Sequence, residues 1–594
     1  MKPTTKYSLI AAGFVLAGVA GWRMWELFQK EQLWSYWPLA FFTGGWLGLR
    51  LLFTRKWTPE DRNWRWLGLS ALSGILLSLG FPPFPLTPLL FVAFVPLLMV
   101  EDELSQSPKS ARKVFRFAYN TFAIWNILVT YWVANTAFAA GIVAIFLNAF
   151  FMTGPFVLFH LAKKYIPRLA YLSFIVFWIS FEMLHLHWEI SWSWLNLGNA
   201  FAEFPAWVQW YEYTGIFGGT FWVLLANVLI FKFIKTRKAA APARPKWELQ
   251  KIILLLLAPL FFSLYKYFTY VEKGRPVEVV VVQPNFEPHY EKFSIPDHQQ
   301  LRRFMTLAEN SLTQSTDYLV FPETSFGMVE VNSFEQNSEI RTLKKFLENY
   351  PRLKLVTGID GYKIFEKSEP ATEHTRTQIR NGRDTFRFEI YNAAIQLTSD
   401  SLNKIPYYKK SKLVPGPEIF PYRKLLFFFE PIVKSLDGSV EGLGTQSIRS
   451  TFESAAGKVA PVICYESVFG EFSTGYVKNG AEAIFIMTND GWWDKTAGHI
   501  QHLKYASLRA IETRRPIARS ANTGISAFID QKGVILQPTK YNEATAINGK
   551  ILFNDERTFY EKWGDIIGRI SVFTALILML NLLVKGLINR TEKK

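Results

Sequence analysis

Apolar residues are distributed unevenly along this chain of 594 residues. From residue 7 to residue 270, apolar stretches alternate with short loops that are basic or contain proline, whereas residues 275 to about 560 have the mixed polarity of a soluble domain. One more apolar run, from about residue 566 to residue 587, precedes a basic tail. The pattern predicts a bundle of membrane helices with a water-exposed domain inserted before the last helix.

A helix needs roughly 20 apolar residues to cross the hydrocarbon core of a bilayer. By this measure the sequence contains about ten candidate spans, two of them short. They cover residues 7–28, 36–53, 66–80, 86–100, 114–133, 138–161, 172–188, 216–233, 252–270 and 566–587. A hydrophobic share of 49% and an aromatic share of 16% also favour a membrane protein over a large soluble enzyme.

Lysine and arginine gather in alternate loops, which predicts the orientation of the helices. The loops at 54–65, 108–113, 163–168 and 232–251 and the tail at 585–594 are basic, whereas the intervening loops at 81–85 and 134–137 contain neither residue. Basic loops tend to stay in the cytoplasm. We therefore expect both termini in the cytoplasm of a bacterium and the water-exposed domain on the periplasmic side of the inner membrane.

The chain is thus expected to have four parts. Residues 1–65 hold two leading helices, residues 66–272 form the main helical membrane domain, residues 273–560 form the periplasmic domain, and residues 561–594 hold the last helix and a basic cytoplasmic tail. Much of the net charge of +17 lies in the cytoplasmic loops, where membrane topology explains it. The sequence therefore predicts no nucleic-acid partner.

Short β-branched runs bounded by turn residues mark strands in the periplasmic part. They cover residues 277–282, 318–321, 353–356, 392–397, 459–463, 483–487, 517–520 and 524–529. Residues 500–513 repeat apolar positions at helical spacing before Pro516 ends the pattern. Strands that alternate with helices over this length predict a layered α/β domain, in which functional residues follow the strand ends.

Three residues in such settings carry candidate chemistry. Cys464, the only cysteine, ends one strand-like run, Glu323 follows another at Pro322, and Lys410 lies in a third. A thiol, a carboxylate and an ammonium group can serve as nucleophile, general base and oxyanion-stabilising cation in acyl transfer. Taken alone, each has an ordinary interpretation: Cys464 as a packed thiol, Glu323 as a solvated cap at a strand end, and Lys410 as a surface charge. A single cysteine also excludes a disulfide within the chain.

The residues around this trio carry a resemblance. Phe-Pro-Glu323-Thr, Tyr-x-Lys410-x-x-Leu-Val-Pro-x-x-Glu418 and Cys464-Tyr465-Glu466 together resemble the Glu-Lys-Cys pattern of the nitrilase superfamily. With membrane spans on both sides, the chain is similar to the apolipoprotein N-acyltransferase family. Further stretches that match this family lie at residues 80–85, 192–198, 282–285, 488–493, 499–516 and 519–524.

The resemblance implies a polytopic α-helical membrane domain joined to a periplasmic nitrilase-like domain, an α/β fold built as an αββα sandwich. It also implies an acyltransferase that moves an acyl chain from a phospholipid, through a thioester on Cys464, to the N-terminal diacylglyceryl-cysteine of an apolipoprotein. Glu323 would be the base and Lys410, with a backbone N–H near Tyr465, the oxyanion site. Glu418 would orient Lys410, and Tyr465 and Glu466 would shape the nucleophile loop.

Two features depart from the family pattern. Gly416-Pro417 stands where members often carry Phe-Gly before the second glutamate, so the local path of the backbone is open. The two spans before residue 53 exceed the usual eight helices.

Lipid contacts are expected from aromatic segments. Residues 425–433, with Phe427, Phe428 and Phe429, fit either an arm that enters the bilayer interface or a helix packed in the core. Trp492 and Trp493 are the other candidates for lipid contact. The group Trp188, Trp192 and Trp194 fits an interfacial aromatic belt or the wall of a lipid entrance.

We expect no metal and no cofactor. His499 and His502 are three residues apart on a helix but lack an evident third ligand, and Glu182, His185 and His187 fit a polar cluster at the edge of a span. The sequence contains no phosphate-binding glycine loop of the Walker or dinucleotide type. The expected partners are the phospholipid donor and the apolipoprotein acceptor, and the expected state is a monomer.

Two other functions fit the same residues. A membrane-tethered amidase or nitrilase-type hydrolase would use water in place of the amine. A lipid-binding or transport protein would use the outer domain without catalysis, although the spans contain few charges and no obvious inverted repeat.

Overall fold

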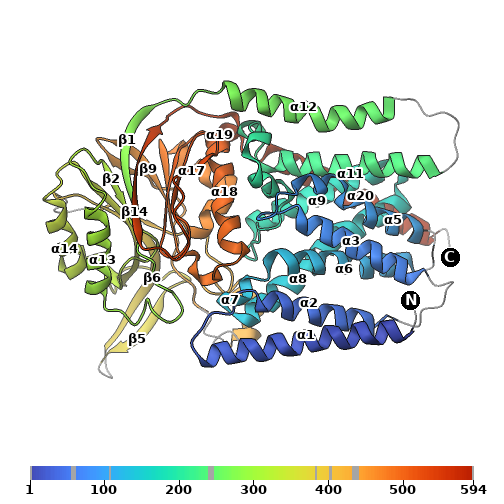
Figure 1. Ribbon diagram of the computed structural model, residues 1–594, viewed down its shortest axis with the longest axis horizontal. Coiled ribbons are helices and arrows are strands. Elements are labelled where there is room, and N and C mark those ends of the chain that lie inside the picture. Colours follow the sequence, from blue (N-terminus) through green and yellow to red (C-terminus); the bar gives the residue numbers. More distant parts are fainter. Residues whose placement is uncertain are drawn as a thin grey trace.

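The computed structural model describes residues 3–54, 62–105, 107, 109–238, 247–380, 384–400, 405–430 and 440–591. A bundle of long helices lies beside a two-sheet α/β domain, and the chain passes from the bundle into the domain and back to it through the last helix (Figure 1). Both ends of the chain lie at the side of the bundle that faces away from the α/β domain.

The helical part contains long helices and short connecting turns. Its elements are α1 (Pro3–Gln29), α2 (Trp37–Leu52), α3 (Asn63–Leu79), η1 (Thr87–Leu89), α4 (Leu90–Ala93), α5 (Val95–Leu104), α6 (Ser110–Thr130), α7 (Val133–Thr136), α8 (Phe138–Tyr165), η2 (Pro167–Leu169), α9 (Ala170–His187), η3 (Leu197–Glu203), η4 (Pro205–Trp207), α10 (Tyr211–Thr214), α11 (Ile216–Lys238), α12 (Trp247–Thr269), α19 (Phe559–Trp563) and α20 (Ile566–Thr591).

Six helices in the described part of the chain are long and apolar enough to cross a membrane. They cover Thr4–Gln29, Phe138–Tyr165, Pro167–His187, Ile216–Arg237, Trp247–Thr269 and Ile566–Ile588. The protein is therefore a multi-pass membrane protein. Of the other predicted spans, α2 and α3 have only 16 and 17 residues, and α6 carries Arg112, Lys113 and Arg116 near its start.

The single helix predicted for residues 86–100 is wrong. That stretch forms three short pieces, η1, α4 and α5, with Pro88 near the start of the first and Pro96 near the start of the last. Proline has no N–H and fits the first turn of a helix, so each one starts a new segment. Apolar composition alone does not reveal such breaks.

Helices α1 and α2 form a hairpin in which glycines allow close contact. A Cβ atom placed on Gly44 would lie 2.6 Å from the backbone oxygen of Gly13 and 2.9 Å from the nitrogen of Ala17. Gly45, one residue further, would meet nothing nearer than the Ala17 Cβ at 4.0 Å. Small residues in these positions bring membrane helices together through backbone contact.

The α/β domain consists of two sheets. The first has the order β14-β1-β2-β4-β6-β5, with β3 pairing to β4 and β7 to β6, and the second has the order β13-β12-β11-β10-β9-β8. The strands of the first are β1 (Arg275–Gln283), β2 (Tyr318–Val320), β3 (Val329–Glu330), β4 (Lys354–Phe365), β5 (Arg376–Arg380), β6 (Asp384–Leu397), β7 (Tyr407–Lys409) and β14 (Thr545–Phe553). Those of the second are β8 (Phe452–Ser454), β9 (Gly457–Ile463), β10 (Ala483–Thr488), β11 (Ile517–Ala521), β12 (Ala527–Ile529) and β13 (Ile535–Leu536).

Helices cover both outer faces of the sheet pair. The first sheet is flanked by α13 (Asp297–Glu309) and α14 (Ser338–Leu347), and the second by α17 (Gly470–Lys478) and α18 (Ala497–Thr513) (Figure 1). The short elements are η5 (Phe334–Gln336), α15 (Arg423–Leu426), η6 (Phe427–Phe429), η7 (Cys464–Val468) and η8 (Asp490–Trp493). The αββα sandwich is therefore confirmed.

Strand β1 shows how sequence produces this layering. Val279 and Val281 lie in the core between the sheets, whereas Val280 and Val282 lie in the core shared with α13 and α14. Successive side chains of a strand point to opposite faces, so an unbroken valine run suits a strand that is covered on both sides.

Helix α18 joins the α/β domain to the bundle. Ala506 and Ala510 belong to the same hydrophobic core as the strands of the second sheet, while Tyr505 and Leu508 belong to the core of the helical part. The Tyr505 hydroxyl donates to the backbone oxygen of Trp194, 2.8 Å away. One helix is thus shared by both hydrophobic cores, which fixes the second sheet against the bundle.

We predict that Gly44→Val separates the α1–α2 hairpin. The added side chain has no space against Gly13, and overpacking of this kind costs about 1–3 kcal/mol. The variant is expected to lose thermal stability in detergent and to become sensitive to protease at the turn between the two helices. Gly45→Val is the matched control and should behave as the parent does; equal behaviour of the two variants would contradict this account of the packing.

Candidate active site

A buried lysine lies between two glutamates at the edge of the first sheet. The Lys410 Nζ atom donates to Glu323 Oε1 at 3.0 Å and to Glu418 Oε1 at 2.7 Å. The Asn392 amide also donates to Glu323, at 2.7 Å. Burial lowers the pKa of Lys410, but the carboxylates of Glu323 and Glu418 outweigh it and raise that pKa well above the ordinary value. The lysine therefore stays charged.

The order of the strands explains why these residues meet. Glu323 lies just beyond β2 and Lys410 follows β7, both in the first sheet, while Cys464 follows β9 in the second. The thiol thus approaches the lysine and the glutamate from the opposite sheet. It interacts electrostatically with both groups.

Cys464 is held in an unusual conformation. Its φ angle is +47°, a region that side-chain-bearing residues rarely adopt, and only 7% of its surface is exposed. Burial raises the pKa of the thiol, the Glu323 carboxylate raises it further, and Lys410 lowers it. The resting sulfur is therefore a neutral thiol, and a base must remove its proton before it can react.

Glu466 ties the turn after Cys464 to the strand that leads to Lys410. One carboxylate oxygen accepts from the Tyr408 hydroxyl at 2.6 Å and from the Ser411 N–H at 2.7 Å, and the other accepts from the Ile463 N–H at 2.9 Å. Glu466 is fully buried. Its side chain thus joins β7 of one sheet to β9 of the other beside the thiol.

The Gly416-Pro417 departure leaves Glu418 in reach of Lys410. Gly416 has a φ of +100°, which glycine adopts freely, and its N–H donates to the oxygen of Ile419 at 2.8 Å. The second oxygen of Glu418 accepts from the Val414 N–H at 2.8 Å. The short turn therefore closes on itself and presents the carboxylate to the lysine.

Comparison with known proteins identifies the family. A family model for the apolipoprotein N-acyltransferase N-terminal domain matches residues 73–229, and a model for carbon-nitrogen hydrolase matches residues 279–558. An apolipoprotein N-acyltransferase of Chlorobaculum tepidum is 28% identical over 527 residues, which span 86% of this chain and 95% of that protein. The chain belongs to the apolipoprotein N-acyltransferase family.

A second curated relative covers a similar share of the chain. An apolipoprotein N-acyltransferase of Geobacter metallireducens is 27% identical, spanning 84% of this chain and 91% of that protein. A crystal structure of a nitrilase-superfamily member from Saccharomyces cerevisiae has 16% identity and a TM-score of 0.33, and covers 50% of this chain and 96% of that one. The hairpin of α1 and α2 lies before the matched N-terminal domain.

Lys292 is a residue near the site of this acyltransferase that the sequence patterns did not reveal. Its Nζ atom donates to the backbone oxygen of Thr324 at 2.6 Å and to the Thr324 hydroxyl at 2.7 Å. Thr324 has a φ of +47°, which is strained for a β-branched residue. Lys292 therefore holds the turn that carries Glu323. A lysine nine residues after the end of β1 gives no signal of such a contact in the sequence.

The two histidines considered as metal ligands have other partners. His502 lies 2.8 Å from both Asp490 Oδ1 and Ser467 Oγ. His499 packs against the Tyr541 ring, and burial lowers its pKa to about 4. Within the described ranges, no group of three or more His, Cys, Asp and Glu side chains is arranged to hold a metal.

Glu182, near the end of α9, accepts hydrogen bonds from other groups of the helical part. Glu182 accepts from Trp178 Nε1, from the Leu197 N–H at 2.8 Å and from the Thr220 hydroxyl at 2.7 Å. This contact pattern fits the simpler interpretation, a polar cluster between helices. His185 is buried and His187 is exposed.

The aromatic candidates for lipid contact differ in their surroundings. Leu425, Phe427 and Phe428 are 70%, 65% and 58% exposed, so this part of the segment is not packed in the core. The side chain of Phe429 and residues 431–439 lie outside the described part. Trp492 meets the His289 ring edge-on, with 5.1 Å between ring centres.

Two tryptophans instead lie at the junction of the two parts. The ring centre of Trp493 is 4.8 Å from Trp132 and 5.4 Å from Trp194. Trp194 is almost fully buried, and its ring lies 6.0 Å from that of Tyr465. Trp194 therefore packs between the domains rather than in an interfacial belt.

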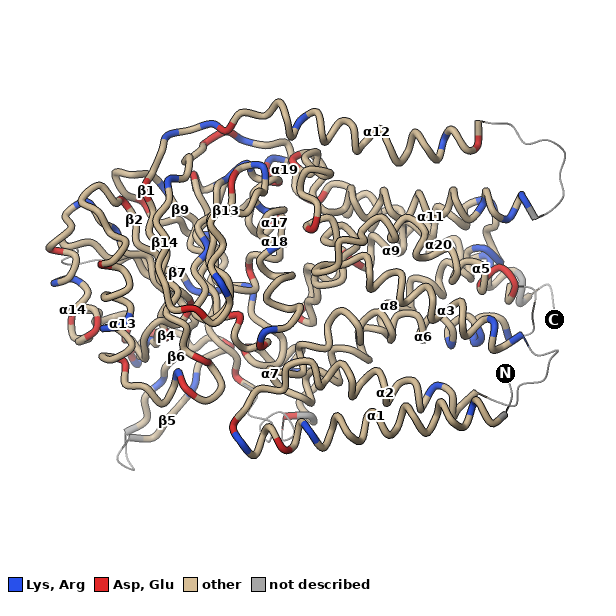
Figure 2. The backbone as a smooth tube through the Cα atoms, in the orientation of Figure 1, with Lys and Arg blue, Asp and Glu red and all other residues tan. Residues whose placement is uncertain are grey.

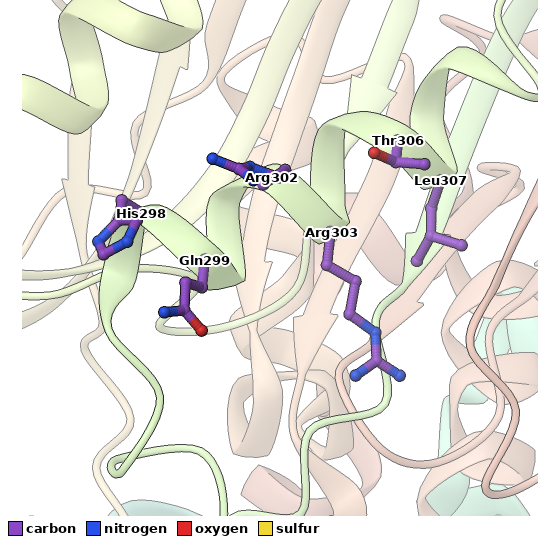
Figure 3. A pocket seen from close by; sticks show the side chains of 6 residues that line it. All are labelled: His298, Gln299, Arg302, Arg303, Thr306 and Leu307. Carbon is purple, nitrogen blue, oxygen red and sulfur yellow. The ribbon is translucent and has the colours of Figure 1, made fainter.

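A surface hollow on α13 is separate from this site. It is lined by His298, Gln299, Arg302, Arg303, Thr306 and Leu307. Figure 3 shows these side chains along one helix, and none of the predicted catalytic residues is among them. The helix covers the face of the first sheet opposite the second sheet (Figure 1).

We predict that Glu466→Ala loosens the nucleophile turn. The substitution removes the acceptor of five groups, at about 1–3 kcal/mol for each one that is buried. They are the hydroxyls of Tyr408 and Tyr476 and the backbone N–H groups of Ser411, Lys412 and Ile463. Because Cys464 is the only thiol, the rate of its alkylation by iodoacetamide measures how accessible the turn makes the sulfur. The variant should react faster than the parent.

Glu453→Ala on neighbouring β8 is the matched control, since Glu453 is 71% exposed and pairs with Lys458. It should react at the parent rate. An unchanged rate in Glu466→Ala would show that this carboxylate does not hold the turn.

Proposed function

We propose that this acyltransferase N-acylates the N-terminal diacylglyceryl-cysteine of apolipoproteins, with a phospholipid as the acyl donor. The observation that carries the proposal is the charged Lys410, hydrogen-bonded to Glu323 and Glu418 beside the only thiol of the chain. Family membership supports the acceptor, because curated relatives over most of the chain are named apolipoprotein N-acyltransferases.

The first half-reaction forms a thioester. Glu323 takes the proton of Cys464, and the thiolate attacks the ester carbonyl of the phospholipid. Lys410 and the backbone N–H of Tyr465 stabilise the negative charge that develops on the carbonyl oxygen. The carbon–oxygen bond then breaks, and the proton held by Glu323 passes to the leaving oxygen to give a lysophospholipid.

The second half-reaction forms an amide. The α-amino group of the diacylglyceryl-cysteine attacks the thioester, and Glu323 takes a proton from the nitrogen. The carbon–sulfur bond breaks, and the sulfur regains a proton. Glu418 orients Lys410 through its 2.7 Å hydrogen bond, and Tyr465 and Glu466 hold the turn.

Both substrates are anchored in lipid, so the site must lie close to the bilayer. The Tyr465 hydroxyl donates to the oxygen of Ser191 in the helical part, at 2.9 Å, directly beside the nucleophile. This contact supports a site held against the membrane domain. The exposed Leu425, Phe427 and Phe428 offer an apolar surface for acyl chains.

The orientation is also a proposal. Lysine and arginine of the bundle gather toward the end that faces away from the α/β domain, near both termini (Figure 2). Positive residues favour the cytoplasmic side of a membrane. The charge distribution therefore supports a periplasmic catalytic domain at the bacterial inner membrane.

Intact-protein mass spectrometry after incubation with phospholipid tests the proposal. The parent should gain the mass of one acyl chain, hydroxylamine should remove it, and added diacylglyceryl lipopeptide should receive it as an amide. Cys464→Ser should gain no hydroxylamine-sensitive mass. Absence of any adduct in the parent would reject the mechanism, and release of free fatty acid in place of lipopeptide acylation would indicate the hydrolase alternative.

We further predict that Lys410→Met slows thioester formation about 10²–10³-fold, because loss of one oxyanion donor has this cost. Single-turnover mass spectrometry measures the rate. Lys409→Met is the matched control on the same strand, because Lys409 lies over the Tyr391 ring and away from the two glutamates. A parent-like rate in Lys410→Met would remove this lysine from the mechanism.

A further inference from the structure

A buried polar chain that the mechanism does not use lies behind the nucleophile turn. It connects Arg519 of β11, Asp490 of η8, His502 of α18 and Ser467 of η7. The Arg519 guanidinium donates to Asp490 Oδ2 at 2.6 Å, and Asp490 Oδ1 lies 2.8 Å from Nδ1 of His502. All four side chains are at most 1% exposed. Such a closed network is costly to bury unless every member is paired.

Both ring nitrogens of His502 face hydrogen-bond acceptors. Nε2 lies 3.1 Å from the backbone oxygen of Cys464, which can only accept. Burial raises the pKa of Asp490, but Arg519 and His502 outweigh it and hold that pKa well below the ordinary value. The carboxylate is therefore ionised and accepts from Nδ1.

A second contact of Nδ1 is weaker. Arg519 Nη2 lies 3.2 Å from it, longer than the 2.8 Å contact with Asp490. An unprotonated Nδ1 would set its lone pair against a carboxylate at hydrogen-bond distance. A proton on Nδ1 removes this repulsion and is donated to Asp490.

The chain ends on the peptide group that joins Cys464 to Tyr465. The Cys464 oxygen accepts from the Ser467 hydroxyl at 2.8 Å and from His502 Nε2 at 3.1 Å. A peptide group is planar, so its C=O and N–H point in opposite directions. Two donors on the oxygen thus fix the direction of the Tyr465 N–H and polarise it. They also hold Cys464 at its strained φ of +47°.

We propose that His502 is a positioning residue for the acyl transfer. It holds the Cys464–Tyr465 peptide group so that the N–H faces the oxyanion, and the N–H that it polarises favours the thiolate of Cys464. The part that concerns the oxyanion rests on the proposed function, whereas the part that concerns the thiol does not.

The groups that face His502 and the Cys464 thiol come from several elements. Asp490 and Arg519 face His502 from η8 and β11, η7 presents Ser467, and the rings of Trp194 and Trp493 lie 5.9 and 5.4 Å from the imidazole. The charged groups that interact with the thiol are Glu323 and Lys410 on the other side of the turn and Asp490 on this side. Replacing His502 leaves these charges in place and removes one hydrogen-bond donor to the Cys464 oxygen.

The test compares His502→Gln and His502→Leu with His499→Gln, a matched control one turn away on the same helix. His502→Leu should slow acylation of Cys464 by phospholipid by up to about 100-fold, because a small misplacement of a reacting group can have this cost. The KM for phospholipid should stay within about threefold of the parent. His502→Gln, which keeps a neutral donor, should lie between, and the control should match the parent.

The pH dependence of Cys464 alkylation by iodoacetamide gives a second readout that needs no acyl donor. His502→Leu should need a higher pH for half-maximal alkylation, His502→Gln should need a smaller increase, and His499→Gln should need none. Parent-like acylation or an unmoved alkylation curve in folded His502→Leu would overturn the proposal. A variant that only melts earlier, with unchanged rate and curve in its folded fraction, would show a purely structural role and overturn it too.

If the parent forms no acyl-enzyme but the alkylation curve of the His502 variants shifts as expected, the proposed function fails and the effect of His502 on the thiol stands. If the parent forms the thioester and the curve does not move, the inference fails alone.

Discussion

The site depends on compensation of a buried ammonium group. An isolated charge inside a protein is strongly unfavourable, so Lys410 requires the two carboxylates that contact it. Those contacts in turn place Glu323 and Glu418 on either side of the lysine. The neutral thiol of Cys464 lies next to this charged group. A fixed positive charge beside a thiol that must lose its proton is the arrangement that electrostatic catalysis of acyl transfer requires.

Much of the surrounding structure keeps these groups from moving. Lys292 holds the turn of Glu323, Glu466 holds the turn of Cys464, and both turns contain a residue with positive φ. Helix α18 adds a further constraint, because it belongs to the hydrophobic cores of both the α/β domain and the bundle. The turn of Cys464 and the membrane helices therefore form one packed unit.

The sequence allowed prediction of those features that depend on local pattern. All eight β-branched runs contain strands, and residues 500–513 lie within α18. The motifs around Glu323, Lys410 and Cys464 also identified the family correctly. Strand β14 was not foreseen, because its place beside β1 depends on pairing between residues almost 270 positions apart, such as Val281 and Ile547. The break at residues 86–100 was missed because apolar content outweighed the two prolines.

The parts of the site that sequence did not reveal are those that act through distant contacts. Lys292 and Asn392 look like surface polar residues in the chain, and only the fold brings them to Glu323 and its turn. His502 was considered as a metal ligand because histidine spacing was the only available signal. Its actual partners come from three other elements, which no spacing rule connects.

The central claim is that the acyl chain rests on the protein between two separate steps. The most direct measurement is the amount of lysophospholipid released when the enzyme meets phospholipid before any lipopeptide is added. The account predicts a burst of one lysophospholipid per protein, which then stops until the amine acceptor arrives. Release only in the presence of the acceptor would contradict it, because the acyl chain would then pass directly from donor to acceptor without a thioester.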